Sequence, residues 1–256
     1  MNLALLQLDI VWGNPAENVR CAELLMDESP ECDLYVLPEM WATGFTQQPE
    51  TMAEEENSSI ALQWMKAKAV EHHCAICGSL AVRVKDGSYR NRMYFVTPDK
   101  LYYYDKHHLF TPEEENCHYQ SGKEHTIVTW RGFRFLLLIC YDLRFPVWSR
   151  YGIAGEYDAI IYTANWPRSR QQAWEILIQS RAIENQCYVV AVNRVGDDVK
   201  TSYIGGSAVI DPIGRTIVCC TENAEQSLTA TLSIDDLVKA RSRFNVLSDR
   251  DLTVPL

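Results

Sequence analysis

Short apolar runs that end at turns or charged residues recur along most of the chain and predict buried strands. Residues 74–84 and 89–97, for example, flank an Asp-Gly turn at 86–87 and predict a hairpin. The other strands are expected at residues 3–10, 33–37, 101–105, 126–130, 133–139, 158–163, 187–193, 207–210, 216–220 and 227–232.

Longer segments between these runs predict helices. Asn14 and Pro15 supply an N-cap and a proline for the first helical position, so a helix should run from here to about Asp27. Further helices are expected over residues 58–73, over about 169–186, and from about 235. The β–α–β units and hairpins form two similar halves with no Pro-, Gly- or Ser-rich linker between them. The pattern predicts one α/β domain, residues 1–256, as a four-layer α-β-β-α sandwich of two mixed β-sheets with helices outside.

Charge and hydropathy narrow the class of protein. A net charge of −10 and a pI near 5.1, without any basic run, argue against partners such as nucleic acid or an anionic membrane surface. The chain opens on an apolar strand pattern without a cationic leader segment, and no apolar stretch approaches the length of a membrane span. We therefore expect a cytoplasmic globular protein.

The nine cysteines predict reduced thiols rather than a metal site. Cys74 and Cys77 resemble a C-x-x-C motif, but residues three apart in a strand point to opposite faces and cannot chelate one ion. Cys219 and Cys220 are adjacent in another predicted strand and should also face apart. No suitably spaced histidine pair completes a zinc site, so no metal is expected.

One cysteine occupies a special position. Cys140 ends an unbroken apolar run at residues 136–139, and Pro146 a few residues later suits the first turn of a helix. A side chain between a buried strand and a helix can be held rigidly while the N–H groups of the turn face a ligand. On this stretch alone, Cys140 is equally well interpreted as a small buried apolar residue.

Two other polar residues stand in similar settings. Glu39 follows the predicted strand at 33–37, and Lys106 follows the strand at 101–105. In α/β sheets, sites collect where several strands end on the same side. Glu39, Lys106 and Cys140 together would supply a base, a cation for an oxyanion, and a nucleophile. Taken singly, Glu39 is more simply interpreted as a solvated loop charge and Lys106 as a surface lysine.

Three segments resemble the signature motifs of the nitrilase superfamily of carbon–nitrogen hydrolases. They are Leu37-Pro38-Glu39-Met40, residues 104–110 (YDKHHLF) and residues 139–146 (ICYDLRFP), and residues 181–186 (RAIENQ) resemble a fourth motif. The resemblance covers nearly the whole chain. It implies that Glu39 takes the proton of Cys140, that Lys106 and the N–H of Tyr141 stabilise the oxyanion, and that a thioester forms on Cys140. No metal or organic cofactor is implied.

The resemblance also implies a second glutamate on the loop after the lysine, seven residues before a glycine. Glu115 stands in this relation to Gly122, and its expected role is to orient Lys106 and the substrate amide. Glu113 and Glu114 precede it directly, so the assignment can slip by a position. An acidic run that is merely solvated is the competing interpretation.

Within the superfamily the chain is similar to the omega-amidases, notably in residues 104–110, 145–150 and 164–167. This implies hydrolysis of the terminal amide of 2-oxoglutaramate or 2-oxosuccinamate, small anionic amides whose carboxylate needs a cationic partner. Nitrile, N-carbamoyl or other aliphatic amide hydrolysis, or a non-catalytic scaffold, are the alternatives. The candidate substrate-binding residues are Arg168, Arg170, Arg144 (which would rather brace the loops near Cys140), Tyr141, Phe45 and Trp166.

The family resemblance also implies a homodimer or larger homo-oligomer, formed through the helix that follows the nucleophile. That assembly would bury Phe145, Val147 and Trp148, which together form an apolar and aromatic face.

Overall fold

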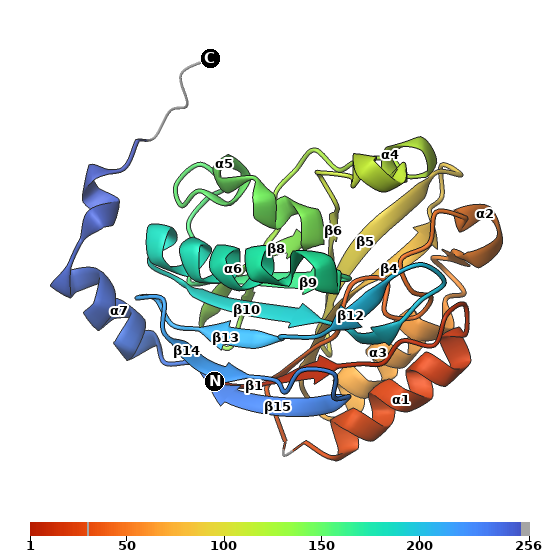
Figure 1. Ribbon diagram of the computed structural model, residues 1–256. Coiled ribbons are helices and arrows are strands. Elements are labelled where there is room, and N and C mark those ends of the chain that lie inside the picture. Colours follow the sequence, from red (N-terminus) through yellow and green to blue (C-terminus); the bar gives the residue numbers. More distant parts are fainter. Residues whose placement is uncertain (30, 252–256) are drawn as a thin grey trace.

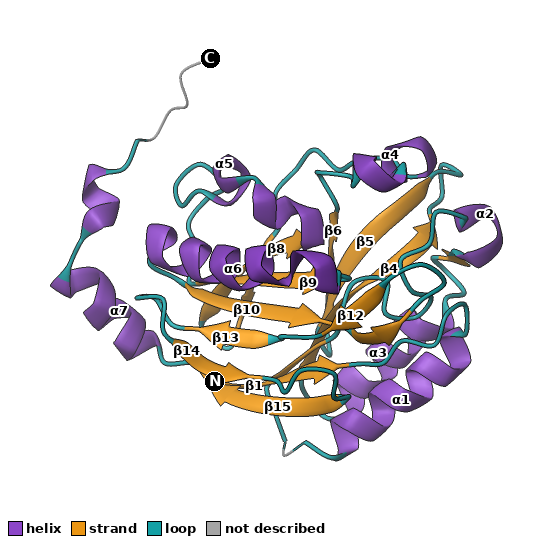
Figure 2. Cartoon of the chain, in the orientation of Figure 1, coloured by secondary structure: helices purple, strands orange, loops and turns teal. Residues whose placement is uncertain are grey.

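Two mixed β-sheets stack face to face at the centre of the computed structural model, which describes residues 1–29 and 31–251 (Figures 1 and 2). Residues 30 and 252–256 of the predicted single domain lie outside the described residues. The first sheet has the order β15 (Gln226–Thr231), β1 (Asn2–Gln7), β2 (Leu34–Val36), β4 (Ala75–Arg83), β5 (Tyr89–Val96) and β6 (Leu101–Asp105), with β3 (Glu54–Glu55) paired to β4. The second has the order β14 (Thr216–Cys219), β13 (Ala208–Ile210), β10 (Tyr188–Asn193), β9 (Ala159–Ala164), β8 (Phe133–Ile139) and β7 (Ile127–Trp130).

Helices cover the outer faces of both sheets. The helices α1 (Pro15–Asp27) and α3 (Ile60–Glu71) pack on the first sheet, and α6 (Gln171–Asn185) packs on the second, as Figure 1 shows. Asn14 caps α1 as expected, because its side chain accepts a hydrogen bond from the N–H of Glu17 at 3.2 Å. The predicted α-β-β-α sandwich is confirmed.

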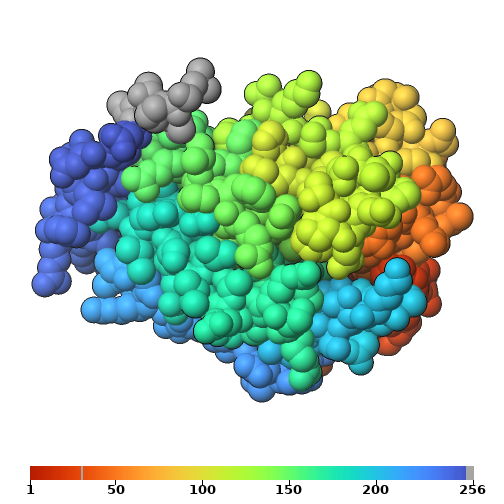
Figure 3. Space-filling model, turned by 45° about the horizontal axis from the view of Figure 1, so that its top comes forward, coloured from red at the N-terminus to blue at the C-terminus, as the bar shows by residue number. Residues whose placement is uncertain are grey.

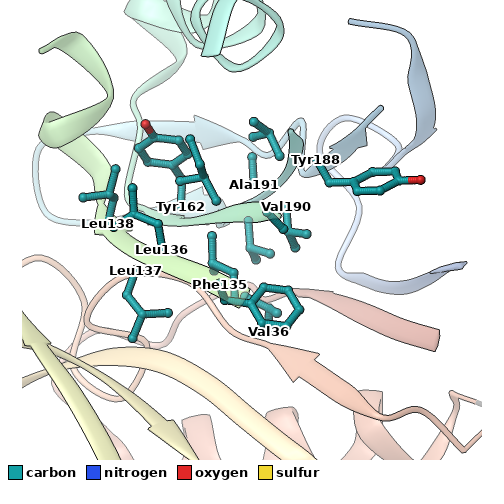
Figure 4. Close-up of a cluster of buried hydrophobic side chains, with 14 of the residues drawn as sticks. Val36, Phe135, Leu136, Leu137, Leu138, Tyr162, Tyr188, Val190 and Ala191 are labelled. Atoms are coloured by element: carbon teal, nitrogen blue, oxygen red, sulfur yellow. The ribbon is translucent and has the colours of Figure 1, made fainter. Parts of the chain in front are cut away.

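Strands that are buried on both faces explain the unbroken apolar runs. In β1, Leu3 and Leu5 pack between the sheets, whereas Ala4 and Leu6 face α1 and α3. In β8, Leu137 points toward the first sheet, and its neighbours Leu136 and Leu138 point the other way (Figure 4). The sequence pattern therefore has no polar alternation here, as expected for central strands.

Strand directions bring several chain segments to one edge of the two sheets. In the first sheet β1, β2 and β4 are parallel, and β6 runs in the same direction because two antiparallel pairings separate it from β4. In the second sheet β8, β9 and β10 are parallel. The segments after β2, β6, β8 and β9 consequently meet at this common edge. The strand β5 is antiparallel to its neighbours, so its first residues lie at the same edge.

Short and polar elements were not predicted from the sequence. The expected loop at 106–125 contains a 3₁₀ turn at Thr111–Glu113 and the one-turn helix α4 (Glu115–His118). The hairpin of β11 (Val195–Asp197) and β12 (Ser202–Ile204) and the short helix α2 (Pro49–Met52) were also not expected. These unpredicted segments are too short to show the periodicity that marks longer helices and strands. The helices α5 (Pro146–Ser149) and α7 (Ile234–Arg243), in contrast, begin where the sequence predicted helices.

The cysteines that lie close together in the sequence, Cys74 with Cys77 and Cys219 with Cys220, face apart as expected. Cys77 packs between the two sheets and Cys74 packs on the helical side of the first sheet. Cys219 is exposed, whereas Cys220 is buried. No helix in the described part of the chain is both long and apolar enough to cross a membrane.

Candidate active site

A fully buried cluster of charges lies where β2 and β6 end. The ammonium of Lys106 donates to Oε1 of Glu39 at 2.8 Å and to Oε2 and Oε1 of Glu115 at 2.8 and 3.1 Å. None of the three side chains is more than 1% exposed. Two carboxylates and one ammonium give the cluster a net charge of −1. The structure thus brings together Glu39, Lys106 and Glu115, and Glu115 is the member of the run 113–115 that bonds Lys106.

Backbone and amide N–H groups complete the surroundings of the two carboxylates. Oε2 of Glu39 accepts from the backbone N–H of Asn165 at 2.9 Å, and Oε1 accepts from the side chain of Asn91 at 2.7 Å. Oε2 of Glu115 accepts from the backbone N–H of Phe110 at 2.6 Å. These donors compensate the carboxylates for the water that burial removes.

Cys140 lies beside this cluster in a strained backbone conformation. Its φ angle is +42°, a left-handed value that a residue with a Cβ rarely adopts, and it starts the 3₁₀ turn Cys140–Arg144 directly after β8. Burial raises the pKa of the Cys140 thiol well above its ordinary value; the charge of Glu39 adds to this and Lys106 opposes it. The thiol is therefore protonated at neutral pH, and a base must remove its proton when it reacts.

Lys106 remains protonated despite its burial. Desolvation acts to lower the pKa of Lys106, but the charges of Glu115 and Glu39 outweigh it and raise the pKa above the ordinary value. Burial also raises the pKa of Glu115, against the opposing effect of Lys106. The site thus holds a permanent cation next to a neutral thiol.

Asp142 ties the turn at Cys140 to the loop that follows Lys106. Its Oδ2 accepts from the hydroxyl of Tyr104 at 2.8 Å and from the N–H of Ile139 at 3.0 Å. Its Oδ1 accepts from the backbone N–H of His108 at 2.9 Å and lies 2.8 Å from the Nδ1 of the same residue. The buried carboxylate of Asp142 therefore links the turn at Cys140 to the residues on either side of Lys106.

The segment 181–186 secures the turn from the opposite side. The guanidinium of Arg181, on α6, donates to the carbonyl oxygen of Leu143 at 2.6 Å. Asn185 accepts from the N–H of Tyr151 at 2.9 Å and donates to the carbonyl oxygen of Arg181 at 3.0 Å. This fourth motif thus holds the chain that follows Cys140 against α6.

A pocket opens over Cys140; its empty space, including the part open to solvent, is about 420 Å³. On the molecular surface, the segments near residues 110, 145 and 170 and the hairpin near residue 200 adjoin one another (Figure 3). The walls of the pocket are partly aromatic, which is typical of a site for a small molecule. The lining residues are Glu39, Phe45, Lys106, Phe110, Glu113, Cys140, Tyr141, Arg144, Asn165, Trp166, Pro167, Arg170, Thr201 and Tyr203.

Five of the six expected substrate-binding residues line this pocket: Phe45, Tyr141, Arg144, Trp166 and Arg170. Arg168 does not line it. The side chain of Arg168 is exposed and donates to Asn223 at 2.7 Å, because the 3₁₀ turn Arg168–Arg170 directs the two arginines differently.

The expectation that Arg144 braces the loops is not supported. Its guanidinium lies 4.8 Å from the ring centre of Trp166, and that of Arg170 lies 5.2 Å from the ring centre of Phe110. Among the described residues neither side chain has an ion-pair or hydrogen-bond partner, so both guanidinium groups are available at the pocket. The bracing role belongs to Arg181 instead.

Sequence reasoning missed three polar residues that hold the site together: Asn91, Asp142 and Asn165. Asn165 directly follows β9, so the same strand-end rule that indicated Cys140 applies to it. Asn91 is a polar residue on the face of β5 whose next members, Met93 and Phe95, lie in the core between the sheets. A polar side chain on such a face is a signal for a buried hydrogen-bond network.

Two stacked mixed sheets with these groups at their common edge form the architecture that the three sequence motifs predict. The chain matches the family model for carbon–nitrogen hydrolases over residues 2–242. The omega-amidase YafV of Yersinia enterocolitica is 40% identical over 253 residues, which cover 98% of this chain and 97% of that protein. A 2-oxoglutaramate amidase of Bacillus subtilis is 34% identical over 251 residues, which cover 96% of each chain.

A solved structure agrees with these relatives. The Xanthomonas campestris protein XC1258, a CN-hydrolase superfamily protein with an arsenic adduct in its active site, has a TM-score of 0.94 and 37% sequence identity. The match covers 100% of this chain and 99% of that one. This chain belongs to the carbon–nitrogen hydrolase family, and its resemblance to the omega-amidases is confirmed. It is a hydrolase that acts on carbon–nitrogen bonds.

The geometry around Asp142 generates a stability prediction. Asp142→Asn replaces one acceptor oxygen by an NH₂ group that faces existing donors, so we expect the free energy of unfolding to fall by about 2–3 kcal/mol. Urea denaturation measures the loss. Asp99→Asn, an exposed turn substitution, is the control and should change stability by less than about 0.5 kcal/mol. Equal effects of the two substitutions would contradict a bracing role for Asp142.

Proposed function

We propose that this enzyme hydrolyses the terminal amide of small omega-amido keto acids such as 2-oxoglutaramate and 2-oxosuccinamate, releasing the dicarboxylate and ammonia. One observation carries the proposal: a buried Glu39–Lys106–Glu115 cluster beside Cys140 opens into a pocket that presents two unpaired arginines, Arg144 and Arg170, among the described residues. The relatives from Yersinia enterocolitica and Bacillus subtilis, an omega-amidase and a 2-oxoglutaramate amidase, support it.

Acylation begins with the neutral thiol of Cys140. Glu39 takes the thiol proton while the sulfur attacks the carbonyl carbon of the amide. Lys106 has three N–H groups; with one directed to each carboxylate, the third remains for the oxyanion, together with the N–H of Tyr141. Loss of one such donor typically raises a barrier by about 3 kcal/mol.

The intermediate collapses to a thioester. Glu39 gives its proton to the nitrogen, the carbon–nitrogen bond breaks, and ammonia leaves. Glu39 then takes a proton from a water molecule that attacks the thioester carbonyl carbon. The carbon–sulfur bond breaks, the thiol of Cys140 regains its proton, and the carboxylate product forms. Glu115 keeps Lys106 oriented through both steps.

The far carboxylate of the substrate determines the choice among amides. A carboxylate accepts paired hydrogen bonds from a guanidinium group, and such charge-assisted bonds are about twice as strong as neutral ones. Phe45, Phe110 and Trp166 wall the space between Cys140 and the arginines. A short carbon chain with an amide at one end and a carboxylate at the other matches this arrangement.

An assay panel tests the substrate class. We expect ammonia release from 2-oxoglutaramate, and little from an aliphatic nitrile or an N-carbamoyl amino acid, because neither combines a primary amide with a suitably placed carboxylate. Coupled glutamate dehydrogenase detects the ammonia. Faster turnover of a nitrile or an N-carbamoyl substrate would indicate that substrate class instead. Absence of 2-oxoglutaramate turnover at millimolar concentration would refute the proposed activity.

The variant Glu39→Gln separates an enzyme from a scaffold of the same fold. Its ammonia release should fall at least a thousandfold, about the upper range for loss of a general base. Incubation with 2-oxoglutaramate should leave an acyl adduct on Cys140 because deacylation also requires Glu39. Intact mass spectrometry detects the adduct, with Cys140→Ala as the control. An unmodified Cys140 in both the variant and the native enzyme favours the scaffold.

Arginine variants test carboxylate recognition. Arg144→Met should raise the KM for 2-oxoglutaramate about tenfold or more, because one charge-assisted hydrogen-bond pair is lost, and leave the kcat/KM for a neutral amide nearly unchanged. The same substitution at Arg168, whose side chain lies outside the pocket, is the matched control and should leave KM unchanged. If kcat/KM falls equally for 2-oxoglutaramate and for the neutral amide, Arg144 has a structural role instead.

We also propose a homodimer, formed through α5 and the outer face of α6. Val147 of α5 and Ile176 and Ile183 of α6 are 51–55% exposed. The expected contribution of Phe145 and Trp148 is smaller than the sequence suggested. Phe145 already stacks on His108 at 3.8 Å, and Trp148 lies between the rings of His107 and His125.

Sedimentation equilibrium tests the dimer. The native protein should sediment at twice the chain mass of 29.3 kDa, and Ile176→Asp should weaken the association by burying a charge. Val70→Asp on α3, a similarly exposed valine on the opposite side of the sandwich, is the control. A monomeric native protein would rule the proposal out.

A further inference from the structure

Asn91 contacts every charged member of the buried cluster. Its Nδ2 donates one hydrogen to Oε1 of Glu39 at 2.7 Å and the other to Oε1 of Glu115 at 2.9 Å. Its backbone carbonyl oxygen accepts from the N–H of Lys106 at 3.0 Å. The side chain is 1% exposed and does not line the pocket over Cys140. Asn91 therefore acts on the cluster and not on a bound substrate.

Ser79 fixes the orientation of this amide. The hydroxyl of Ser79 donates to Oδ1 of Asn91 at 2.9 Å and accepts from the backbone N–H of Met40 at 2.9 Å. The opposite amide orientation would place Oδ1 against two carboxylates, which are acceptors only. The NH₂ group must therefore face Glu39 and Glu115.

The hydrogen bond from Asn91 makes the two carboxylate oxygens of Glu39 inequivalent. Oε1 accepts from both Asn91 and Lys106, so both of its lone-pair directions are occupied. Oε2 accepts from the backbone N–H of Asn165. One lone-pair direction of Oε2 remains for the Cys140 thiol.

We propose that Asn91 is a positioning residue for the hydrolytic reaction, an inference that rests on the proposed amidase function. Its amide group keeps Glu39 and Glu115 ionised at the same time and directs the thiol proton of Cys140 to Oε2 of Glu39. Without the two N–H donors, the buried cluster with its net charge of −1 would bind a proton between the carboxylates. A Glu39 that shares this proton would be a weaker base for the Cys140 thiol.

The direction of the pH effect follows from this geometry. Hydrogen bonds to an ionised carboxylate lower its pKa, so their loss raises the pKa and moves the acidic limb of kcat/KM to higher pH. The charged and titratable groups that face the pair are Lys106, Cys140 and Tyr119, and across the pocket Glu113, Arg144 and Arg170. All of them remain unchanged when only Asn91 is replaced.

Asn91→Leu removes both donors and keeps the number and branching of the side-chain heavy atoms. With 2-oxoglutaramate we expect kcat at pH 7 to fall about tenfold to a hundredfold and KM to change less than about threefold. The acidic limb of kcat/KM should move up by about one to two pH units, the range that loss of a hydrogen bond to a charged group implies. The rate of Cys140 alkylation by iodoacetamide, followed by peptide mass spectrometry, should show the same shift without amide turnover.

Asn18→Leu is the matched control. Asn18 is also 1% exposed, and its amide bonds the backbone of Val11 and Ala42. It should lower the melting temperature and leave the acidic limb in place. An acidic limb that stays put in an active Asn91→Leu enzyme, or moves equally in both variants, overturns the proposal.

A second variant covers the case in which Asn91→Leu does not fold. Ser79→Ala frees the amide of Asn91 to rotate and should move the acidic limb in the same direction by a smaller amount. If Asn91→Leu is unfolded and Ser79→Ala shows no shift, the proposal fails. Failure of 2-oxoglutaramate hydrolysis by the native enzyme counts against the substrate assignment alone, because alkylation still reports the role of Asn91.

Discussion

Burial of the Lys106 ammonium between Glu39 and Glu115 is the constraint on which the site depends. Removing one partner of a buried ion pair typically costs about 3–5 kcal/mol, because an unpaired charge is left in a medium of low polarity. The three charges therefore have to be assembled together, with N–H donors on their remaining oxygens. The stacked sheets make this assembly possible by ending several strands at one edge.

At the same edge of the sheets, Cys140 adopts a left-handed backbone conformation. A φ of +42° carries an energetic cost that local sequence does not relieve, so tertiary contacts must hold the residue in place. Asp142 binds the N–H of Ile139 on one side of the turn, and Arg181 binds the carbonyl oxygen of Leu143 on the other. With Glu39 and Lys106 beside the thiol, residues of all four motifs that resemble the family thus meet around one strained residue.

Charge is arranged differently in the two halves of the pocket. At its base, net negative charge surrounds the thiol and favours its protonated form, which suits a nucleophile that loses its proton only during attack. Arg144 and Arg170 line the same pocket without an ion-pair partner among the described residues and add positive charge to its wall. A small molecule with a neutral amide at one end and a carboxylate at the other would meet a suitable partner at each end.

The sequence by itself determined the stacking of the two sheets, and it made Glu39, Lys106 and Cys140 candidates for one site through their positions after strands and through the family motifs. Apolar runs, caps and turns are local signals, and residues that directly follow parallel strands must gather at one edge whatever the details of packing. Glu115 required the family resemblance, because nothing local distinguishes it from Glu113 and Glu114.

Only the tertiary structure decided which residues hold the site together and which arginines face it. Asn91 lies near the start of a strand that runs opposite to its neighbours, so a rule about carboxyl ends overlooks it. Arg168 and Arg170 are two residues apart, and only the 3₁₀ turn that contains them points one outward and the other into the pocket. Such choices depend on side-chain direction and on partners distant in sequence, which hydrophobic periodicity does not encode.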